Sequence, residues 1–531
     1  MAHVRLRSRS ALVTVLGWAL ASAVPCFAAL PCGPNNVVNW CVHQETVGVI
    51  SAAFANERFG AALAFGDFDA DGFDDLAVGI PGEVGAGGVV AGAVQVFRGS
   101  ATGLTFTGQL VFGQDVLPGD DGSVEEADEF GAALEVGDFN EDGVDDLAIG
   151  VPGEDVSGGS CGSECPDAGA IQVVYGGPGG LDLASAHFIQ SVGGNEDQAR
   201  LGTALAAGRF GPPGGQVGDD LMIGSPFGSS GGSVRVALAS PEGLNQGIVS
   251  LQLFSELGCG GSTRRFGAAL AVGRFDDQSH DNFVVADPAC DVNGFAGAGA
   301  VGFRSGYSGA PTVLLQTDYT GAANAANDKF GAAMAVGNFD ADSFDDLAVA
   351  APFKNHGSGN PSDSGRVYVA YGSASGPDPS DGADIIGEDE WASSGDTPGD
   401  GELFGTGLAA GDVDDDGFDD LIVGAPGEGT FDVGRVYVKP GGPTGLTTVG
   451  NTLFTQTALG GQNATDDHLG TALALGDIDG DGVLELALGV PDKNVGDLVN
   501  AGMVYVTRIL YLLGNDGFES GNTLAWSGVS P

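Results

Sequence analysis

The chain has 531 residues, of which 94 are glycine and 43% are hydrophobic, and its formal net charge is −52. Because a nucleic acid partner needs a basic surface, this charge argues against nucleic acid binding and favours cations as ligands. The high glycine content is also typical of disordered chains, but here the hydrophobic residues fall in short runs bounded by Gly, Asp and Pro, which predicts many short strands joined by turns.

The N-terminus has the parts of a secretory signal peptide. A basic region with three arginines precedes a short apolar segment (residues 11–24), and small residues suit cleavage after Ala28. We therefore expect residues 1–28 to be removed and the protein to be secreted or held at the cell surface. Lipid attachment through Cys26 is the alternative, and Pro25 before it argues against this. The apolar segment is short for a membrane span, and no later segment reaches that length.

Removal of the signal peptide leaves six cysteines in three close pairs. An even number in an exported chain predicts disulfides that staple local loops. Six cysteines allow fifteen pairings, and sequential pairing is one of them. A metal site would need two CxxC-like pairs near each other, which the chain lacks. The close pairs are Cys32 with Cys41, Cys161 with Cys165, and Cys259 with Cys290.

One sequence pattern occurs seven times at intervals of 64 to 74 residues. Each copy opens with Phe-Gly or Leu-Gly, continues through a short apolar stretch and an aspartate-rich loop, and ends in a run such as DLAVGIP. A near-constant period is typical of a structural unit that buries its apolar face only against copies of itself. The openings are Phe59-Gly60, Phe130-Gly131, Leu201-Gly202, Phe266-Gly267, Phe330-Gly331, Phe404-Gly405 and Leu469-Gly470.

The first copy shows what each unit contains. Residues 59–68, 75–81, 92–97 and 104–112 have the composition of four short strands, and the acidic loop lies between the first two. Four strands with local contacts predict a propeller blade, so the fold class is all-β, a seven-bladed β-propeller with four-stranded blades. A linear solenoid is the alternative, but it would need polar caps at both ends, and none is evident.

The seventh copy ends after its third strand near Arg508. A candidate for the missing strand lies before the first copy, in residues 37–50, and pairing the two chain ends would close the ring. The predicted organisation is a signal peptide (1–28), a closing N-terminal strand of blade 7 (29–58), blades 1 to 7 (59–129, 130–200, 201–265, 266–329, 330–403, 404–468 and 469–508) and a C-terminal tail (509–531).

Five acidic loops follow the pattern D-x-[DN]-x-D-G-x-x-[DE] or a close variant. Side-chain oxygens at positions one, three and five, a backbone carbonyl at seven and an acid at nine form a ligand set for a hard cation. With the seventh residue acting through its carbonyl, the predicted metal ligands are Asp67, Asp69, Asp71, Phe73 and Asp75; Asp138, Asn140, Asp142, Val144 and Asp146; Asn338, Asp340, Asp342, Phe344 and Asp346; Asp412, Asp414, Asp416, Phe418 and Asp420; and Asp477, Asp479, Asp481, Val483 and Glu485.

Calcium is the predicted ion, with up to five sites, because many oxygens on a flexible loop suit Ca²⁺, whereas Mg²⁺ requires a strict octahedron and transition metals prefer His or Cys. Glycine at position six permits the positive φ that wraps the loop around an ion. Ser343 stands there in the loop that begins at Asn338, so we expect that site to be the weakest. An EF-hand would need a glutamate at position twelve and flanking helices, and position twelve is Val, Ile or Leu. Acidic turns that merely face water would not explain a spacing repeated five times.

Copies three and four have lost the pattern. Each carries an arginine, Arg209 or Arg274, where the first carboxylate would stand. We expect this guanidinium to fill the place of the cation and to pair with a nearby acid, with Asp219 and Asp276 as candidates.

The FG opening, the DxDxDG loop and the closing GIP, GVP or GAP resemble the FG-GAP repeat of integrin alpha chains and of many exported bacterial proteins. The resemblance covers about residues 30–508. It implies a seven-bladed propeller with calcium in loops on one face and partners bound on a face or rim built from other loops. The long variable loops are residues 83–91, 154–168, 354–364 and 428–433. The tail, residues 515–527, looks like short C-terminal segments of secreted bacterial proteins, for which sorting or a disordered end are the two readings.

The sequence shows no catalytic constellation. GSSGG and GGSCG match G-x-S-x-G but do not lie between a strand and a helix, and the six histidines lack HExxH spacing. We therefore expect a monomeric, non-enzymatic, calcium-binding extracellular propeller that serves in binding or adhesion, with a protein or carbohydrate as its partner. A structural surface component without a specific ligand, and an enzyme that acts on polysaccharides or phosphodiesters through its propeller loops, are the alternatives.

Overall fold

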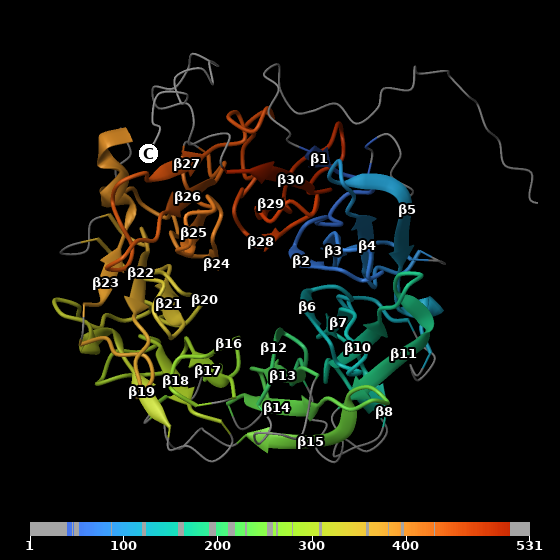
Figure 1. Ribbon diagram of the computed structural model, residues 1–531, viewed down its shortest axis with the longest axis horizontal. Helices are drawn as coiled ribbons and strands as arrows, with labels where there is room; N and C mark the ends of the chain where they lie inside the picture. Colours follow the sequence, from blue (N-terminus) through green and yellow to red (C-terminus); the bar gives the residue numbers. More distant parts are fainter. Residues whose placement is uncertain are drawn as a thin grey trace, which may run out of the picture.

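The computed structural model describes residues 40–509 with short internal gaps, and the described residues form seven four-stranded antiparallel sheets around a central axis (Figure 1). The predicted signal peptide, Cys32, Cys161 and residues 510–531 lie outside the described residues. So do residues 45, 47–52, 86–87, 119–123, 158–163, 191–197, 211–217, 229–230, 252–256, 258, 262–263, 279, 307–310, 357–360, 381, 395–397 and 430.

The strands fill the blades in chain order. Blade 1 holds β2 (Ala62–Gly66), β3 (Asp75–Ile80), β4 (Ala93–Arg98) and β5 (Thr105–Phe112); blade 2 holds β6 (Ala133–Gly137), β7 (Asp146–Val151), β10 (Ala170–Tyr175) and β11 (Asp182–Gln190); blade 3 holds β12 (Ala204–Gly208), β13 (Asp220–Ser225), β14 (Ser233–Leu238) and β15 (Asn245–Leu251); blade 4 holds β16 (Ala269–Gly273), β17 (Asn282–Asp287), β18 (Ala300–Arg304) and β19 (Thr312–Leu314). Blade 5 holds β20 (Met334–Gly337), β21 (Asp346–Ala351), β22 (Arg366–Ala370) and β23 (Asp384–Ile386); blade 6 holds β24 (Gly407–Gly411), β25 (Asp420–Ala425), β26 (Arg435–Lys439) and β27 (Thr452–Phe454); blade 7 holds β28 (Leu473–Gly476), β29 (Glu485–Val490), β30 (Met503–Arg508) and β1 (Trp40–Val42). The small hairpin β8 (Val156–Ser157) and β9 (Glu164–Cys165) and the 3-10 helices η1 (Gln114–Val116), η3 (Gln316–Asp318) and η4 (Glu388–Ser394) lie in connections.

The two ends of the described chain meet in blade 7. There β1 pairs antiparallel with β30, with Val42 opposite Val504, and Figure 1 shows these elements beside each other. The innermost strands contact one another in order around the ring, and β2 contacts β28. The predicted fold class, a seven-bladed propeller closed by an N-terminal strand, is confirmed, and the linear solenoid is wrong because the two ends share one sheet.

The core lies between neighbouring blades rather than within any one of them. The second strand of every blade is buried along its whole length, because both of its faces are covered by adjacent sheets. One apolar cluster joins Phe339 of blade 5 to Phe404 and Tyr437 of blade 6. Burial of such side chains stabilises the fold by roughly 25 cal/mol per Å² of apolar surface, so each blade depends on its neighbours for its stability.

The glycines of the repeated pattern form the contact between blades. The N–H of Gly60 donates to the carbonyl of Gly79 within blade 1, and the next blade places the carbonyl of Gly131 against Gly79. A Cβ atom built on Gly79 would lie 2.1 Å from that carbonyl oxygen. The FG opening of one blade therefore packs against the GIP run of the blade before it, which explains why the two motifs recur together.

One of the predicted disulfides is observed between described residues, since Cys259 is bonded to Cys290. It links the connection before blade 4 to the loop between β17 and β18. Cys41 and Cys165 are also disulfide-bonded. Because Cys32 and Cys161 lie outside the described residues, the other two sequential pairs stay predictions.

Candidate metal-binding loops

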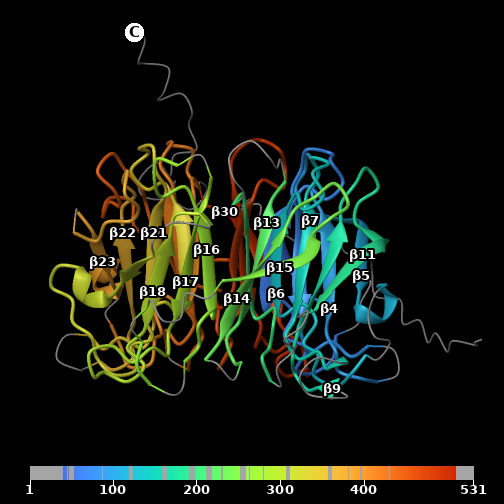
Figure 2. The same ribbon diagram turned by 90° about the horizontal axis from the view of Figure 1, so that it is seen from below.

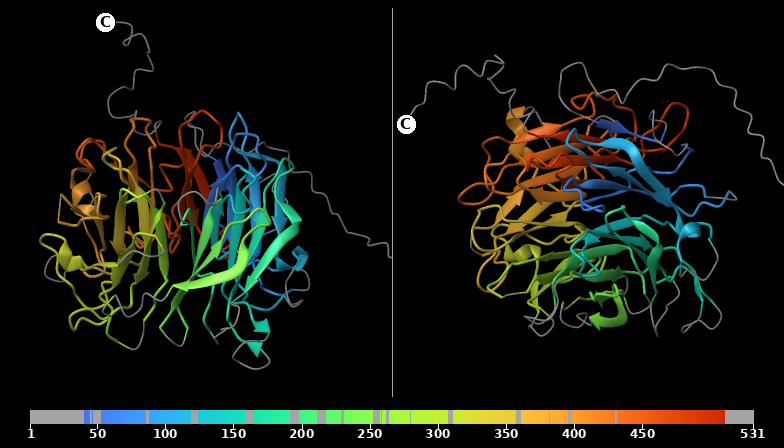
Figure 3. Two further views of the ribbon diagram at one scale, coloured as in Figure 1. Left: turned by 60° about the horizontal axis from the view of Figure 1, so that its bottom comes forward. Right: turned by 45° about the vertical axis from the view of Figure 1, so that its right-hand side comes forward.

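The five acidic loops lie on one face of the propeller. Each connects the first and second strands of a blade, and all blades have the same strand order, so these loops emerge at the same end of the sheets. Figures 2 and 3 show the strands running through the thickness of the disc, with loops gathered at its two ends. We call this end the acidic face and the other end, which carries the second-to-third and fourth-to-first connections, the opposite face.

Hydrogen bonds to the first carboxylate wind each loop into a partial ring. In blade 1 the carboxylate of Asp67 accepts the N–H of Asp71 at 3.0 Å and that of Gly72 at 2.9 Å, and the carboxylate of Asp71 accepts the N–H of Phe73 at 3.2 Å. The same three bonds recur in the loops that begin at residues 138, 412 and 477. In blade 1 the side chains at positions one, three and five come close together.

The loop that begins at Asn338 departs from this geometry at position six. Gly72, Gly143, Gly417 and Gly482 have φ values of 83° to 89°, whereas Ser343 is not among the residues with positive φ. Asn338 has one acceptor oxygen, which takes the N–H of Asp342 at 3.1 Å, and its amide group donates to the Asp342 carbonyl at 3.2 Å. This loop therefore lacks part of the geometry that the other four share, and its weaker ion binding stays a prediction.

The oxygen positions fit a cation in three of the loops. Carboxylate oxygens lie within 4.8 Å of one another in the sets Asp67–Asp69–Asp71, Asp412–Asp414–Asp420 and Asp477–Asp479–Glu485. One buried oxygen of Asp69 and one of Asp414 have no hydrogen-bond partner, which is costly unless another group, such as a metal ion, satisfies them. In the loop at 138, Asn140 instead donates its amide to Asp142 at 3.1 Å.

The acid at position nine also holds the hairpin together through hydrogen bonds, a role that we call a latch. Asp146 accepts the N–H of Phe139 at 2.8 Å and that of Gly176 at 2.8 Å, which ties the loop to the end of the third strand. In blade 3, which has lost the metal pattern, Asp220 makes the same two bonds, to Phe210 and Ala239. This role is therefore independent of any ion.

Burial raises the pKa of each ninth acid. The value rises to about 7 for Asp75, Asp146, Asp346, Asp420 and Glu485, with desolvation as the largest cause and backbone N–H donors acting against it. A bound divalent ion would favour the charged form of these groups.

Sequence reasoning missed the residue at position eight. The carboxylate of Asp145 accepts the N–H of Asp67 from the preceding blade at 2.9 Å, and Asp74 closes the ring by accepting the N–H of Asp477 at 2.8 Å. The bond recurs between successive blades through Asp219, Asp281, Asp345 and Asp419. In the sequence, the role of position eight is marked only by the repeated Asp-Asp pair at positions eight and nine. The metal-ligand pattern accounts for the second aspartate of this pair but not for the first.

The two arginine loops behave differently from each other. Arg209 pairs with Asp219 at 3.1 Å, as predicted, although its side chain is 61% exposed. The predicted pair of Arg274 with Asp276 does not form among the described residues, and the Asp276 carboxylate accepts the N–H of Gln278 at 3.0 Å. Arg274 joins the ring of position-eight acids instead, through its backbone N–H and Asp345 at 2.7 Å.

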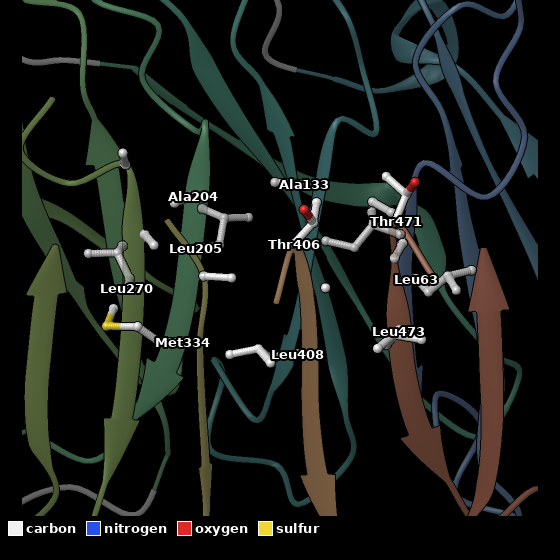
Figure 4. A pocket seen from close by; sticks show the side chains of 17 residues that line it. Leu63, Ala133, Ala204, Leu205, Leu270, Met334, Thr406, Leu408, Thr471 and Leu473 are labelled. Atoms are coloured by element: carbon white, nitrogen blue, oxygen red, sulfur yellow. The ribbon is translucent and has the colours of Figure 1, made fainter. Parts of the chain in front are cut away.

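A cavity of about 300 Å³ opens at the centre of the ring, where the innermost strands converge (Figure 4). Leu63, Leu205, Leu270 and Met334 are among the apolar side chains around it, and Thr406 and Thr471 are its polar side chains. This lining offers packing between blades and no charged ligand group among the described residues.

The comparisons with known proteins agree with the repeat pattern. The model of the FG-GAP repeat matches residues 59–97, 130–174, 330–370, 404–438 and 469–507. These are the five copies with an acidic loop, and the two unmatched copies are those with Arg209 and Arg274. No helix among the described residues is long and apolar enough to cross a membrane.

Curated relatives align with part of the chain. Phosphatidylinositol-glycan-specific phospholipase D of Bos taurus is 33% identical over 192 residues, which is 35% of this chain and 21% of that protein. Integrin alpha-PS2 of Drosophila melanogaster is 42% identical over 100 residues, 17% of this chain and 7% of that protein, and integrin alpha-4 of Xenopus laevis is 31% identical over 162 residues, 30% and 14%. The alignments thus span about a fifth or less of these relatives. Among solved structures, AofleA from Arthrobotrys oligospora aligns over 76% of this chain and 87% of that chain at 8% identity with a TM-score of 0.37.

Proposed function

We propose that this chain, an FG-GAP repeat protein that is homologous over part of its length to integrin alpha chains, is a calcium-stabilised extracellular propeller. Its proposed partner is a protein or a carbohydrate. The observation that carries the proposal is the common geometry of the acidic loops, with unpartnered oxygens in Asp69 and Asp414. Each ion cancels repulsion among carboxylates and fixes one hairpin, and five divalent ions would reduce the net charge of −52 by ten charges.

The opposite face is the proposed partner-binding surface. Five phenylalanines with 40% to 67% of their surface exposed lie in connections that emerge there, and the most exposed is Phe431 between β25 and β26. Exposed aromatic side chains are enriched where proteins bind partners. The other four are Phe54, Phe227, Phe295 and Phe353. Calcium would act from the acidic face, by holding the blades that present these loops.

Removal of calcium tests the proposal. Extracellular modules bind Ca²⁺ with Kd of about 10⁻⁴ to 10⁻³ M, so the protein should melt at a clearly lower temperature in EDTA than in about 2 mM CaCl₂. Binding to a carbohydrate array or to cells should require calcium, and Phe431→Ala should weaken it without changing the melting temperature. Val449→Ala, at a residue 79% exposed on the acidic face, is the matched control. Equal melting temperatures with and without calcium would refute calcium stabilisation, and an absence of any ligand would favour a structural surface component.

An enzymatic role is the second candidate, because phospholipase D proteins are among the relatives. The aligned part is a fifth of those proteins, so their activity is not carried over with it. Turnover of a phosphodiester or polysaccharide panel by the purified chain would favour this candidate over a binding module.

A further inference from the structure

The five blades with acidic loops differ in the type of residue at one position of the third strand. It lies opposite the ninth loop residue in the sheet, and side chains at opposed positions of an antiparallel pair point to the same face. Arg508 pairs with Glu485 in blade 7, and the register of blade 1, continued by one residue, places Arg98 opposite Asp75. The same position holds Tyr175 in blade 2, Tyr371 in blade 5 and Pro440 in blade 6.

Arg508 contacts most of the predicted ligands of its loop. Its Nη2 lies 2.7 Å from Oδ1 of Asp479 and 2.5 Å from Oδ1 of Asp481, and its Nε donates to Oε1 of Glu485. The arginine side chain is 11% exposed and that of Glu485 is fully buried, so this pair is shielded from solvent, whereas the Asp481 side chain is 47% exposed. Three of the four acids in the blade 7 loop are thus already paired with Arg508, whose single positive charge offsets one of their negative charges.

Arg98 makes a weaker version of this arrangement in blade 1. One terminal nitrogen pairs with Asp69, while Nε donates to the carbonyl of Gly108 at 3.3 Å and Nη2 donates to that of Gly179 at 3.2 Å. The guanidinium therefore shares its donors between one loop acid and two backbone carbonyls. One oxygen of Asp69 remains without a partner.

The tyrosines of blades 2 and 5 are bonded to the next blade. The Tyr371 hydroxyl accepts the N–H of Leu446 at 2.9 Å, and the Tyr175 hydroxyl accepts that of Leu244 at 3.3 Å. Beside Tyr371 a cavity of about 260 Å³ borders Asp340 and Asp342. In blade 6 the nearest cation along the strand, Lys439, pairs with Glu390 at 2.5 Å and not with the loop.

We infer that Arg508 is an internal counter-ion that takes the place of the metal in the blade 7 loop, so that this loop binds calcium much more weakly than its complete set of acids predicts. Arg98 reduces affinity in blade 1 to a smaller extent, and no arginine stands at this position in blades 2, 5 and 6, of which the blade 5 loop is weakened separately by Ser343. The inference depends on the proposed calcium binding. Its cause is competition, because an incoming ion must displace a guanidinium that already satisfies the same oxygens, or lie next to its positive charge.

Counting bound ions in the full chain tests the inference. Equilibrium dialysis and calorimetric titration with CaCl₂ would compare the wild type with Arg508→Gln. The control is Arg58→Gln, which removes one positive charge from an arginine that pairs with Asp492 on the opposite face. We expect Arg508→Gln to bind one more ion than the wild type at about 1 mM calcium, a gain of roughly tenfold or more in affinity at that loop, and Arg58→Gln to match the wild type.

Two further variants keep the inference testable if Arg508→Gln fails to fold. Asp479→Asn in the wild-type background should leave the number of bound ions unchanged, whereas Asp414→Asn in blade 6 should remove one. Loss of an ion from Asp479→Asn, or equal ion counts in Arg508→Gln and the wild type, would overturn the inference while the calcium proposal stands. Binding of no ion by any variant, the wild type included, would overturn both.

Discussion

At the scale of single residues, the position two residues before the final glycine of the innermost strand shows how strongly the ring constrains each side chain. Six blades have alanine there, and blade 2 has Glu135. The Glu135 side chain is half-buried, and its carboxyl group lies beside the backbone of Ala207 in blade 3. Burial raises the pKa of Glu135 to about 8, while backbone N–H donors of Ala207 and Val136 act in the other direction.

We expect Glu135→Ala to stabilise the protein more at high pH than at low pH. The folded-state pKa lies above the unfolded value, so the native state binds the proton more tightly, and stability is lost as pH rises from about 4.5 through 8. Alanine removes that loss. Thermal unfolding should show a melting-temperature difference between variant and wild type that is more positive at pH 9 than at pH 5, by about 1–3 °C. A difference independent of pH would contradict the buried-acid interpretation.

At the scale of the hairpin, two acids side by side have separate mechanical roles. The ninth residue ties the loop to the third strand of its own blade, and the eighth ties the blade to its neighbour. Blade 7 has Leu484 at position eight, so this bond is absent between the described residues of blades 6 and 7. Two single-residue features, Leu484 and Arg508, thus make the seventh hairpin different from the others.

We expect Asp220→Ala in blade 3 to destabilise the protein by about 2–4 kcal/mol, because it leaves the N–H groups of Phe210 and Ala239 buried without acceptors. Asp220→Asn keeps one acceptor oxygen and should cost about half as much, as the natural Asn282 accepts the N–H of Phe275 in blade 4. Chemical denaturation with and without calcium measures both costs. Rescue of Asp220→Ala by calcium would show that the acid acts through an ion and not as a latch.

At the scale of the whole molecule, the stability of the ring depends on a three-residue strand. β1 covers the edge of β30, and Val42 is fully buried in a cluster with Phe59 of blade 1 and Val504 of blade 7. Without β1 an edge strand of blade 7 would be open to pairing with other chains.

We expect Val42→Asp to destabilise the protein by about 3–5 kcal/mol and to promote association, because it buries an unpaired charge and detaches the closing strand. Val449→Asp, at a residue 79% exposed, is the matched control and should change stability by less than about 0.5 kcal/mol. Thermal unfolding and size-exclusion chromatography report the two effects. An unchanged melting temperature for Val42→Asp would mean that the ring does not depend on β1.

The order of the amino acids alone predicts the repeat, the number of blades, the closing strand and the candidate ligands, because each of these is a local pattern of residue types with a fixed spacing. The Phe-Gly openings and the acidic loops specify one hairpin each, and a hairpin is built from residues near each other in the chain.

Which groups meet across blades and across strands depends on how the ring folds. Asp145 bonds to a residue 78 positions away, and Arg508 reaches Asp479 and Asp481 because of the register between β29 and β30. A loop pattern in the sequence identifies the carboxylates that could surround an ion. The charge next to those carboxylates depends on the residue that the third strand places opposite the ninth loop residue. For that reason the five loops share one ligand pattern in the sequence, with small variations such as Ser343, and differ more strongly in the folded ring.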